Sequence, residues 1–146
     1  MRDDLLGAEI EPFEVTIEAP LNQYFLGATD EDQPFYLEGK AAPPTCLFGP
    51  ARPGYPDPLA FMGTSFEKAV MGGAAYDIER PPLVGETLVC RGRVSDVKVK
   101  ETPKGNMTFA TLEATFTDAS GAVVVTERLT FIERPLRASP HRPGLL

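Results

Sequence analysis

The sequence predicts a single α+β domain in which one antiparallel sheet wraps around one central helix. Three long segments of alternating apolar and polar residues, 86–100, 106–118 and 122–134, are joined by the turn sequences TPKGN and DASG. Long strands joined by tight turns form an antiparallel meander. An earlier strand and helical segments in the first half of the chain must then cover its apolar face.

The first third of the chain predicts a strand followed by a short helix. We expect residues 1–12 to form an N-terminal arm outside the folded unit. From Phe13 to Glu18 apolar and polar residues alternate, which is typical of a half-buried strand. Pro20 suits a first helical turn and Gly27 a helix end, so we expect a helix over 20–27.

The next segment contains an acidic turn and the expected start of the central helix. Residues 30–32 are Asp-Glu-Asp, and Thr45 follows two prolines as a possible N-cap. The proline-rich run GPARPGYPDP over 49–58 breaks any continuous helix. Residues 59–69 remain open between helix and loop.

From residue 70 onward the pattern indicates strands. VMGGAAYDIER places Ala74, Tyr76 and Ile78 on one face, and PPLVGE forms a turn. In the long segment 86–100 the apolar phase slips by one residue, which predicts a β-bulge near Ser95 and Asp96. We expect the tail over 135–146 to be flexible.

Composition excludes several classes of partner. The chain has 146 residues, 42% hydrophobic, with a net charge of −7, which disfavours nucleic acid and anionic membranes. Cys46 and Cys90 are the only cysteines, and no secretory leader pattern follows Met1, so we expect reduced thiols and a cytoplasmic location. The single histidine, His141, lies in the tail far from either cysteine, so we expect no metal site and no cofactor.

One antiparallel sheet around one helix is the hot-dog layout, and three segments make a family resemblance specific. The acidic turn with QPFY over 33–36 resembles the Gly-Asp-x-Asn-Pro-x-His motif of MaoC-like (R)-specific enoyl hydratases and 3-hydroxyacyl dehydratases. The other two are APPT over 42–45, at the approach to the central helix, and YDIERPPLVGETLVCRGRVSDV. The chain looks most like the N-terminal MaoC-type, or FAS1-like dehydratase, domain over 13–134.

The resemblance implies a thioester site whose catalytic motif is degenerate. In the family an Asp and a His perform syn addition of water across an enoyl thioester, as an acid/base pair. Aligned on Pro34, the Asp position is Glu31, with Asp30 one residue away, the Asn position is Gln33, and the His position is Tyr36. Tyrosine is a poor base at neutral pH, although it donates hydrogen bonds. Similar tyrosine motifs occur in the non-catalytic subunits of heterodimeric hydroxyacyl dehydratases.

The resemblance also implies substrate-binding residues, each with a structural alternative. Backbone amides of Thr45 and Cys46 would hold the thioester carbonyl, or simply begin a helix with Cys46 in the core. Gly72 and Gly73 would let a ligand or a second subunit approach the strand, or form a bulge. Arg91 and Arg93 would meet the phosphates of a CoA or a carrier pantetheine, or form a solvated face, while His141 has no expected role.

The favoured function is therefore an acyl-binding subunit of a hydratase or dehydratase, paired with a second hot-dog subunit that brings the catalytic Asp and His. The substrate would be an acyl-CoA or an acyl-carrier thioester. One alternative is a self-sufficient dehydratase that uses Glu31 or Asp30 with Tyr36. Another is a hot-dog thioesterase with a carboxylate such as Glu67.

Overall fold

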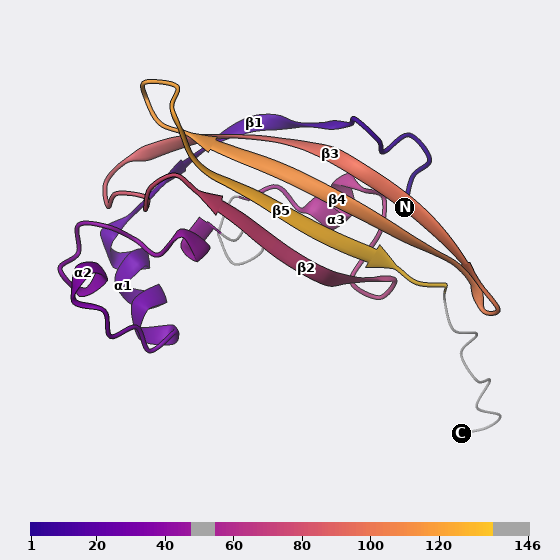
Figure 1. Cartoon of the computed structure of the whole chain (residues 1–146), viewed down its shortest axis with the longest axis horizontal. Helices are drawn as coiled ribbons and strands as arrows, with labels where there is room; N and C mark the ends of the chain where they lie inside the picture. Colours follow the sequence, from indigo (N-terminus) through magenta and orange to yellow (C-terminus); the bar gives the residue numbers. More distant parts are fainter. Residues whose placement is uncertain (48–54, 136–146) are drawn as a thin grey trace, which may run out of the picture.

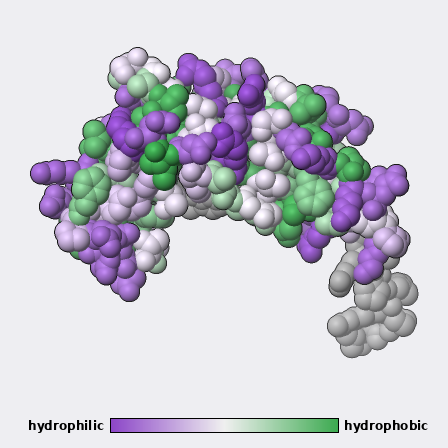
Figure 2. All heavy atoms as spheres, viewed as in Figure 1, coloured by the Kyte–Doolittle hydropathy of each residue, from purple (hydrophilic) through white to green (hydrophobic). Residues whose placement is uncertain are grey.

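A computed structural model describes residues 1–47 and 55–135, which form one five-stranded antiparallel sheet in the order β1-β3-β4-β5-β2 (Figure 1). Its strands are β1 (Glu9–Thr16), β2 (Ala69–Ile78), β3 (Thr87–Thr102), β4 (Gly105–Thr117) and β5 (Val123–Glu133). The long strands curve in the same direction and give the molecule an arched outline (Figure 1; Figure 2). The helices lie on the inner side of this arch (Figure 1). The predicted antiparallel sheet is thus confirmed.

The meander of β3, β4 and β5 follows the sequence pattern closely. Pairing of β3 with β4 shifts register between Val94 and Asp96, which confirms the predicted bulge beside Ser95. Pro103 and Lys104 form the turn between β3 and β4. At the next turn the Asp118 side chain accepts hydrogen bonds from the amides of Ser120 and Ala122, at 2.9 and 3.1 Å. Asp side chains commonly stabilise turns in this way.

The N-terminal residues are more tightly packed than the sequence indicated. The first strand begins at Glu9 rather than Phe13, and Leu5 is only 1% exposed. The Gly7 amide donates to the Val94 carbonyl at 2.9 Å, which attaches this segment to β3. The expectation of a separate arm over 1–12 is wrong for these residues, because a strand bonded on one side tolerates Pro12 and exposed glutamates as a central strand would not. The tail over 136–146 lies outside the described residues.

The helices are short, and the described part of the chain contains four of them. These are α1 (Ala19–Ala28), α2 (Pro34–Leu37), the 3₁₀ turn η1 (Pro44–Leu47) and α3 (Pro58–Phe61). The first confirms the helix expected over 20–27. Asp57 caps α3, because its side chain accepts hydrogen bonds from the amides of Leu59 and Ala60 at 2.9 and 3.3 Å. None of the helices within 1–47 and 55–135 is long and apolar enough to cross a membrane.

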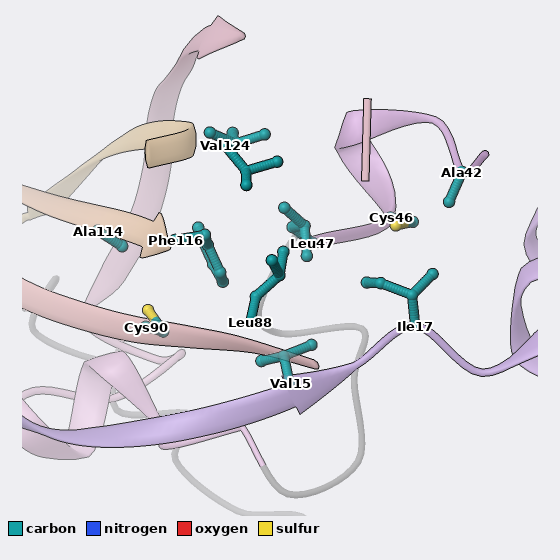
Figure 3. Close-up of a cluster of buried hydrophobic side chains, with 11 residues drawn as sticks. Val15, Ile17, Ala42, Cys46, Leu47, Leu88, Cys90, Ala114, Phe116 and Val124 are labelled. Carbon is teal, nitrogen blue, oxygen red and sulfur yellow. The ribbon is translucent and has the colours of Figure 1, made fainter. Parts of the chain in front are cut away.

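Two apolar clusters cover the inner face of the sheet. In the first, Leu47 of η1 points toward Leu88, Phe116 and Val124 from three strands (Figure 3). In the second, Leu59 and Met62 from the α3 region pack against residues of β3, β4 and β5 such as Leu112. The expected central helix is therefore represented by two single turns, η1 and α3. Most of the proline-rich run between them, residues 48–54, lies outside the described residues.

Strand β2 forms one edge of the sheet and is poorly covered. Val70, Met71 and Ile78 are 38%, 40% and 51% exposed. Pairing with β5 shifts register between Met71 and Gly73. A Cβ added to Gly72 would lie 2.5 Å from Cδ1 of Ile132, so the close approach at this glycine is to the chain's own β5.

Candidate functional site

A mostly apolar pocket of about 530 Å³ lies where α1, η1 and β2 meet. These helices gather below one end of the sheet (Figure 1). The pocket is lined by Ile17, Leu21, Asn22, Tyr24, Phe25, Ala28, Thr29, Thr45, Cys46 and Tyr76. A concave apolar site with a few polar groups is the usual form of a small-molecule site.

Two of the predicted substrate-binding residues, Thr45 and Cys46, lie in this pocket. The Thr45 side chain is exposed and Cys46 is buried, close to Ile17 and Ala42 (Figure 3). The Cys46 amide already donates to the Pro43 carbonyl at 2.9 Å. That amide is used by the 3₁₀ turn itself, so its assignment as a thioester donor requires the turn to open.

The acidic turn has a local structural explanation. Asp30 adopts a left-handed conformation with φ of 52° just after α1. Its amide donates to the Gly27 carbonyl and the Glu31 amide donates to the Leu26 carbonyl, at 3.3 and 2.9 Å. This bonding pattern is the Schellman helix end. The Glu31 side chain then accepts from the Gln33 amide at 2.9 Å, so the Asp30 backbone and the Glu31 carboxylate stabilise the turn between α1 and α2.

None of Asp30, Glu31, Gln33 or Tyr36 lines the pocket. Gln33 is exposed and directly precedes α2. Tyr36 is half-buried and packs edge to face against Phe35, with ring centres 5.3 Å apart. These four residues lie on one short segment between the end of α1 and the middle of α2. Their catalytic roles stay a prediction.

The remaining predicted residues also lie away from the pocket. Gly72 and Gly73 belong to the bulge in β2, and Glu67 is exposed in the turn before that strand. Arg91 and Arg93 line a separate groove of about 420 Å³ across β1, β3 and β4, which shares no residue with the pocket. His141 lies outside the described residues.

Sequence reasoning missed a carboxylate in the core beside the pocket. Glu127 of β5 is 0% exposed, and neither of its carboxylate oxygens makes a hydrogen bond to the residues that the structure describes. Burial raises the pKa of Glu127 from 4.5 to about 7, and the nearby Tyr76 hydroxyl acts in the opposite direction. A buried carboxylate that titrates near neutral pH is typical of functional sites.

The sheet register explains why Tyr76 accompanies this carboxylate. Tyr76 of β2 and Ala114 of β4 lie directly opposite Glu127 on its two sides. Burial raises the pKa of Tyr76, and the Glu127 carboxylate beside it adds to the shift. Tyr76 also lines the pocket, whereas Glu127 does not.

Two further groups face Glu127 from the other side. Burial raises the pKa of the Cys90 thiol to about 12, with a further contribution from Glu127. Burial also raises the pKa of Tyr55, whose ring packs against Phe13 with centres 4.8 Å apart. A thiol held protonated in this way is a weak nucleophile, so Cys90 is a core residue.

Asn22 is the second polar side chain that the sequence did not single out. It is 4% exposed on α1, lines the pocket, and its side-chain oxygen has no hydrogen-bond partner among the described residues. Its position directly after Leu21, within an otherwise apolar helix face, was the available signal. Within the described ranges no three His, Cys, Asp or Glu side chains come together as a metal ion would require.

Comparison with known proteins places this geometry in a family. The model of the FAS1-like dehydratase domain region matches residues 4–127. No curated protein shows significant sequence similarity to the chain.

Solved structures share the fold at low sequence identity. The ChsH1–ChsH2 complex from Mycobacterium tuberculosis contains a chain with 19% identity and a TM-score of 0.67, covering 91% of this chain and 88% of that one. A MaoC-like dehydratase from Rhodospirillum rubrum has 20% identity and a TM-score of 0.66, covering 92% and 97%. The HadBC (3R)-hydroxyacyl-ACP dehydratase complex from M. tuberculosis has 15% identity and a TM-score of 0.57, covering 90% and 99%.

The curved antiparallel sheet is thus a hot-dog fold, as the resemblance implied. The family model spans most of the folded chain, including the acidic turn, the pocket and the first half of β5 as far as Glu127. The chain belongs to the family of FAS1-like dehydratase domains.

Proposed function

We propose that the chain binds the acyl part of an enoyl- or 3-hydroxyacyl thioester, as a subunit that works with a catalytic hot-dog partner. The observation that carries the proposal is the apolar pocket between α1, η1 and β2, which has the volume and lining expected for an acyl chain. The substrate class comes from the family to which the chain belongs.

The division of labour follows from the residues at the motif. The sequence has a single histidine, His141, and the motif's histidine position is Tyr36. Asp30 and Glu31 stabilise the turn after α1 and do not line the pocket. An acid/base pair for the addition or removal of water therefore has to come from elsewhere.

Two of the similar structures are complexes of different subunits, ChsH1–ChsH2 and HadBC. They support a pairing of this chain with a second hot-dog subunit that carries an intact Asp-x-Asn-Pro-x-His motif. A reading frame beside this one that encodes such a subunit is the partner to express with it.

The test separates acyl binding from catalysis. Calorimetric titration of the purified chain with octanoyl-CoA should show binding, whereas crotonyl-CoA should keep its enoyl absorbance when incubated with the chain alone. Ala28→Phe should weaken octanoyl-CoA binding at least tenfold, because the added ring occupies the pocket that Ala28 lines.

Gln23→Phe is the matched control, since Gln23 is exposed on the same helix and does not line the pocket. An equal loss in both variants would show that the acyl chain binds elsewhere. Rapid hydration of crotonyl-CoA by the chain alone, lost in Glu31→Gln or Tyr36→Phe, would refute the supporting role and establish a self-sufficient enzyme.

A further inference from the structure

The pocket has one wall where a polar group is backed by a buried acid. Tyr76 lines the pocket from β2, and Glu127 lies directly opposite it on β5 with no exposed surface. The other tyrosine of the lining, Tyr24, is 76% exposed on α1. Of the two tyrosines in the lining, Tyr76 is therefore the one that lies beside a buried side chain.

A carboxylate without a partner in the core is costly, by several kcal/mol when ionised. The titratable groups that face Glu127 are Tyr76 from β2, Cys90 from β3 and Tyr55 from the segment before α3. Its neighbour on β4 is Ala114, and no Lys or Arg of the described ranges pairs with it. Apart from the Tyr76 hydroxyl, no group of the described ranges offsets the charge, which points to a use beyond packing.

We propose that Tyr76 is the residue that recognises an oxygen on the bound acyl chain, and that Glu127 positions its hydroxyl for this contact. This inference rests on the proposed acyl binding and adds a specificity determinant to it. The ligand class is an acyl thioester with a hydroxyl group within reach of Tyr76, in contrast to a fully saturated chain of the same length.

In the proposed contact, the protonation state of Glu127 decides whether its carboxyl group accepts the Tyr76 hydrogen or donates to the phenol oxygen. An ionised carboxylate only accepts hydrogen bonds, so it takes the Tyr76 hydrogen and leaves the phenol oxygen to accept from the ligand. A ligand hydroxyl can donate to that oxygen, whereas a ligand ketone cannot. A protonated Glu127 can donate to Tyr76 instead, which frees the tyrosine hydrogen for a ligand ketone.

The first experiment compares (3R)-hydroxyoctanoyl-CoA with octanoyl-CoA by calorimetric titration of the full chain at pH 8. We expect the hydroxylated ligand to bind about 3–10-fold more tightly, as one added hydrogen bond predicts. Tyr76→Phe should abolish this preference, so that the two ligands bind with equal affinity. Tyr24→Phe removes the other tyrosine hydroxyl of the lining and should retain the preference.

The second experiment tests the role of Glu127 through pH. The preference for (3R)-hydroxyoctanoyl-CoA over 3-oxooctanoyl-CoA should rise several-fold between pH 6 and pH 8 in the natural chain. Glu127→Gln keeps the shape of the side chain but has no proton to lose, so its preference should be independent of pH over this range. A merely structural role for Glu127 would lower all affinities together and leave the pH dependence in place.

The outcomes separate the two proposals. Equal affinity for the hydroxylated and saturated ligands, or an unchanged preference in Tyr76→Phe, would overturn the recognition role and leave acyl binding intact. Failure of every acyl-CoA to bind would reject both. Circular dichroism of each variant verifies that the fold is retained, so that a lost preference reflects the pocket.

Discussion

Glu127 stands where the alternation of β5 calls for an apolar side chain. Its neighbours on the same face, Val125, Leu129 and Phe131, are all buried in the core. Like Glu127, each of these three points inward, and only the carboxylate carries an ionisable group. Ionisation of this buried group therefore costs free energy, which the other interactions of the fold must offset.

This residue predicts an unusual dependence of stability on pH. Burial raises the pKa of Glu127 to about 7 in the folded chain, whereas its ordinary pKa is 4.5, so the folded state binds more protons between these two pH values. The free energy of unfolding should then fall as pH rises through this window, by on the order of 2–3 kcal/mol. Glu127→Gln should flatten the slope, as urea unfolding at several pH values between 5 and 8 would measure.

Three other acidic side chains affect the stability of the fold over a different pH range. Glu86, Asp118 and Glu133 have lowered pKa values, so their stabilisation is lost only as the solution becomes more acidic than about pH 4.5. Their titration therefore does not contribute to the change in the free energy of unfolding between pH 5 and 7. A natural chain whose stability is constant or rising over that range would show that Glu127 is solvated or paired in solution.

At the scale of elements, one ion-pair network holds two turns of the sheet together. Arg80, just after β2, donates two hydrogen bonds of 2.8 Å to the Glu86 carboxylate and one of 3.3 Å to Asp118. Glu86 also accepts from the Leu83 amide. The network joins the β2–β3 connection to the β4–β5 turn, and Arg80 lowers the pKa of Glu86.

Replacing Arg80 should lower the free energy of unfolding by more than replacing an exposed arginine that forms no ion pair. Arg80→Lys loses the paired geometry that only a guanidinium provides, and we expect a loss of about 1 kcal/mol in the free energy of unfolding. Arg91→Lys is the control, because Arg91 is exposed on β3 and forms no ion pair with the described residues, and it should cost less than about 0.5 kcal/mol. Urea unfolding at pH 7 compares them, and equal losses would contradict the expectation.

At the scale of the whole molecule, the two edges of the sheet differ. The β1 edge has Pro12, exposed glutamates at 9, 11 and 14, and a register shift between Ile10 and Phe13. These features oppose pairing with another strand. The β2 edge is longer and exposes Val70, Met71 and Ile78, which favours coverage by a second subunit.

We expect the purified chain to associate through β2. Sedimentation velocity should show a dimer for the natural chain and a shift toward monomer in Ile78→Lys, where a charge enters the apolar edge. Val99→Lys is the control, because Val99 is 60% exposed on β3, which β4 and β5 separate from β2. A monomeric natural chain, or dimers that persist in Ile78→Lys, would place the partner's surface elsewhere.

Local patterns in the sequence were sufficient for much of the fold. The phase slip near Ser95 predicted the bulge, and Pro20 and Gly27 predicted α1, because each signal acts on neighbouring residues. Of the residues that line the pocket, only Thr45 and Cys46 were named from the sequence as substrate-binding residues. Its other wall depends on which strands become neighbours, and the pairing of β2 with β5, rather than with β3, brings Tyr76 to Glu127.

The acidic turn shows the opposite difficulty. Three adjacent carboxylates beside an expected helix start suggested chemistry, yet Asp30 and Glu31 complete hydrogen bonds around a helix end. Capping and catalysis recruit the same residue types at loop positions, so composition alone does not separate them.

Because Glu127 is completely buried, its carboxyl group can also serve as a spectroscopic reporter. A protonated carboxyl group in an apolar interior absorbs infrared light at a frequency distinct from that of an ionised carboxylate. The chain has 21 acidic side chains, and a difference spectrum between the natural chain and Glu127→Gln isolates the one that is buried on β5. Because that group lies beside the pocket wall, its band would register arrival of an acyl chain without any label attached to protein or ligand.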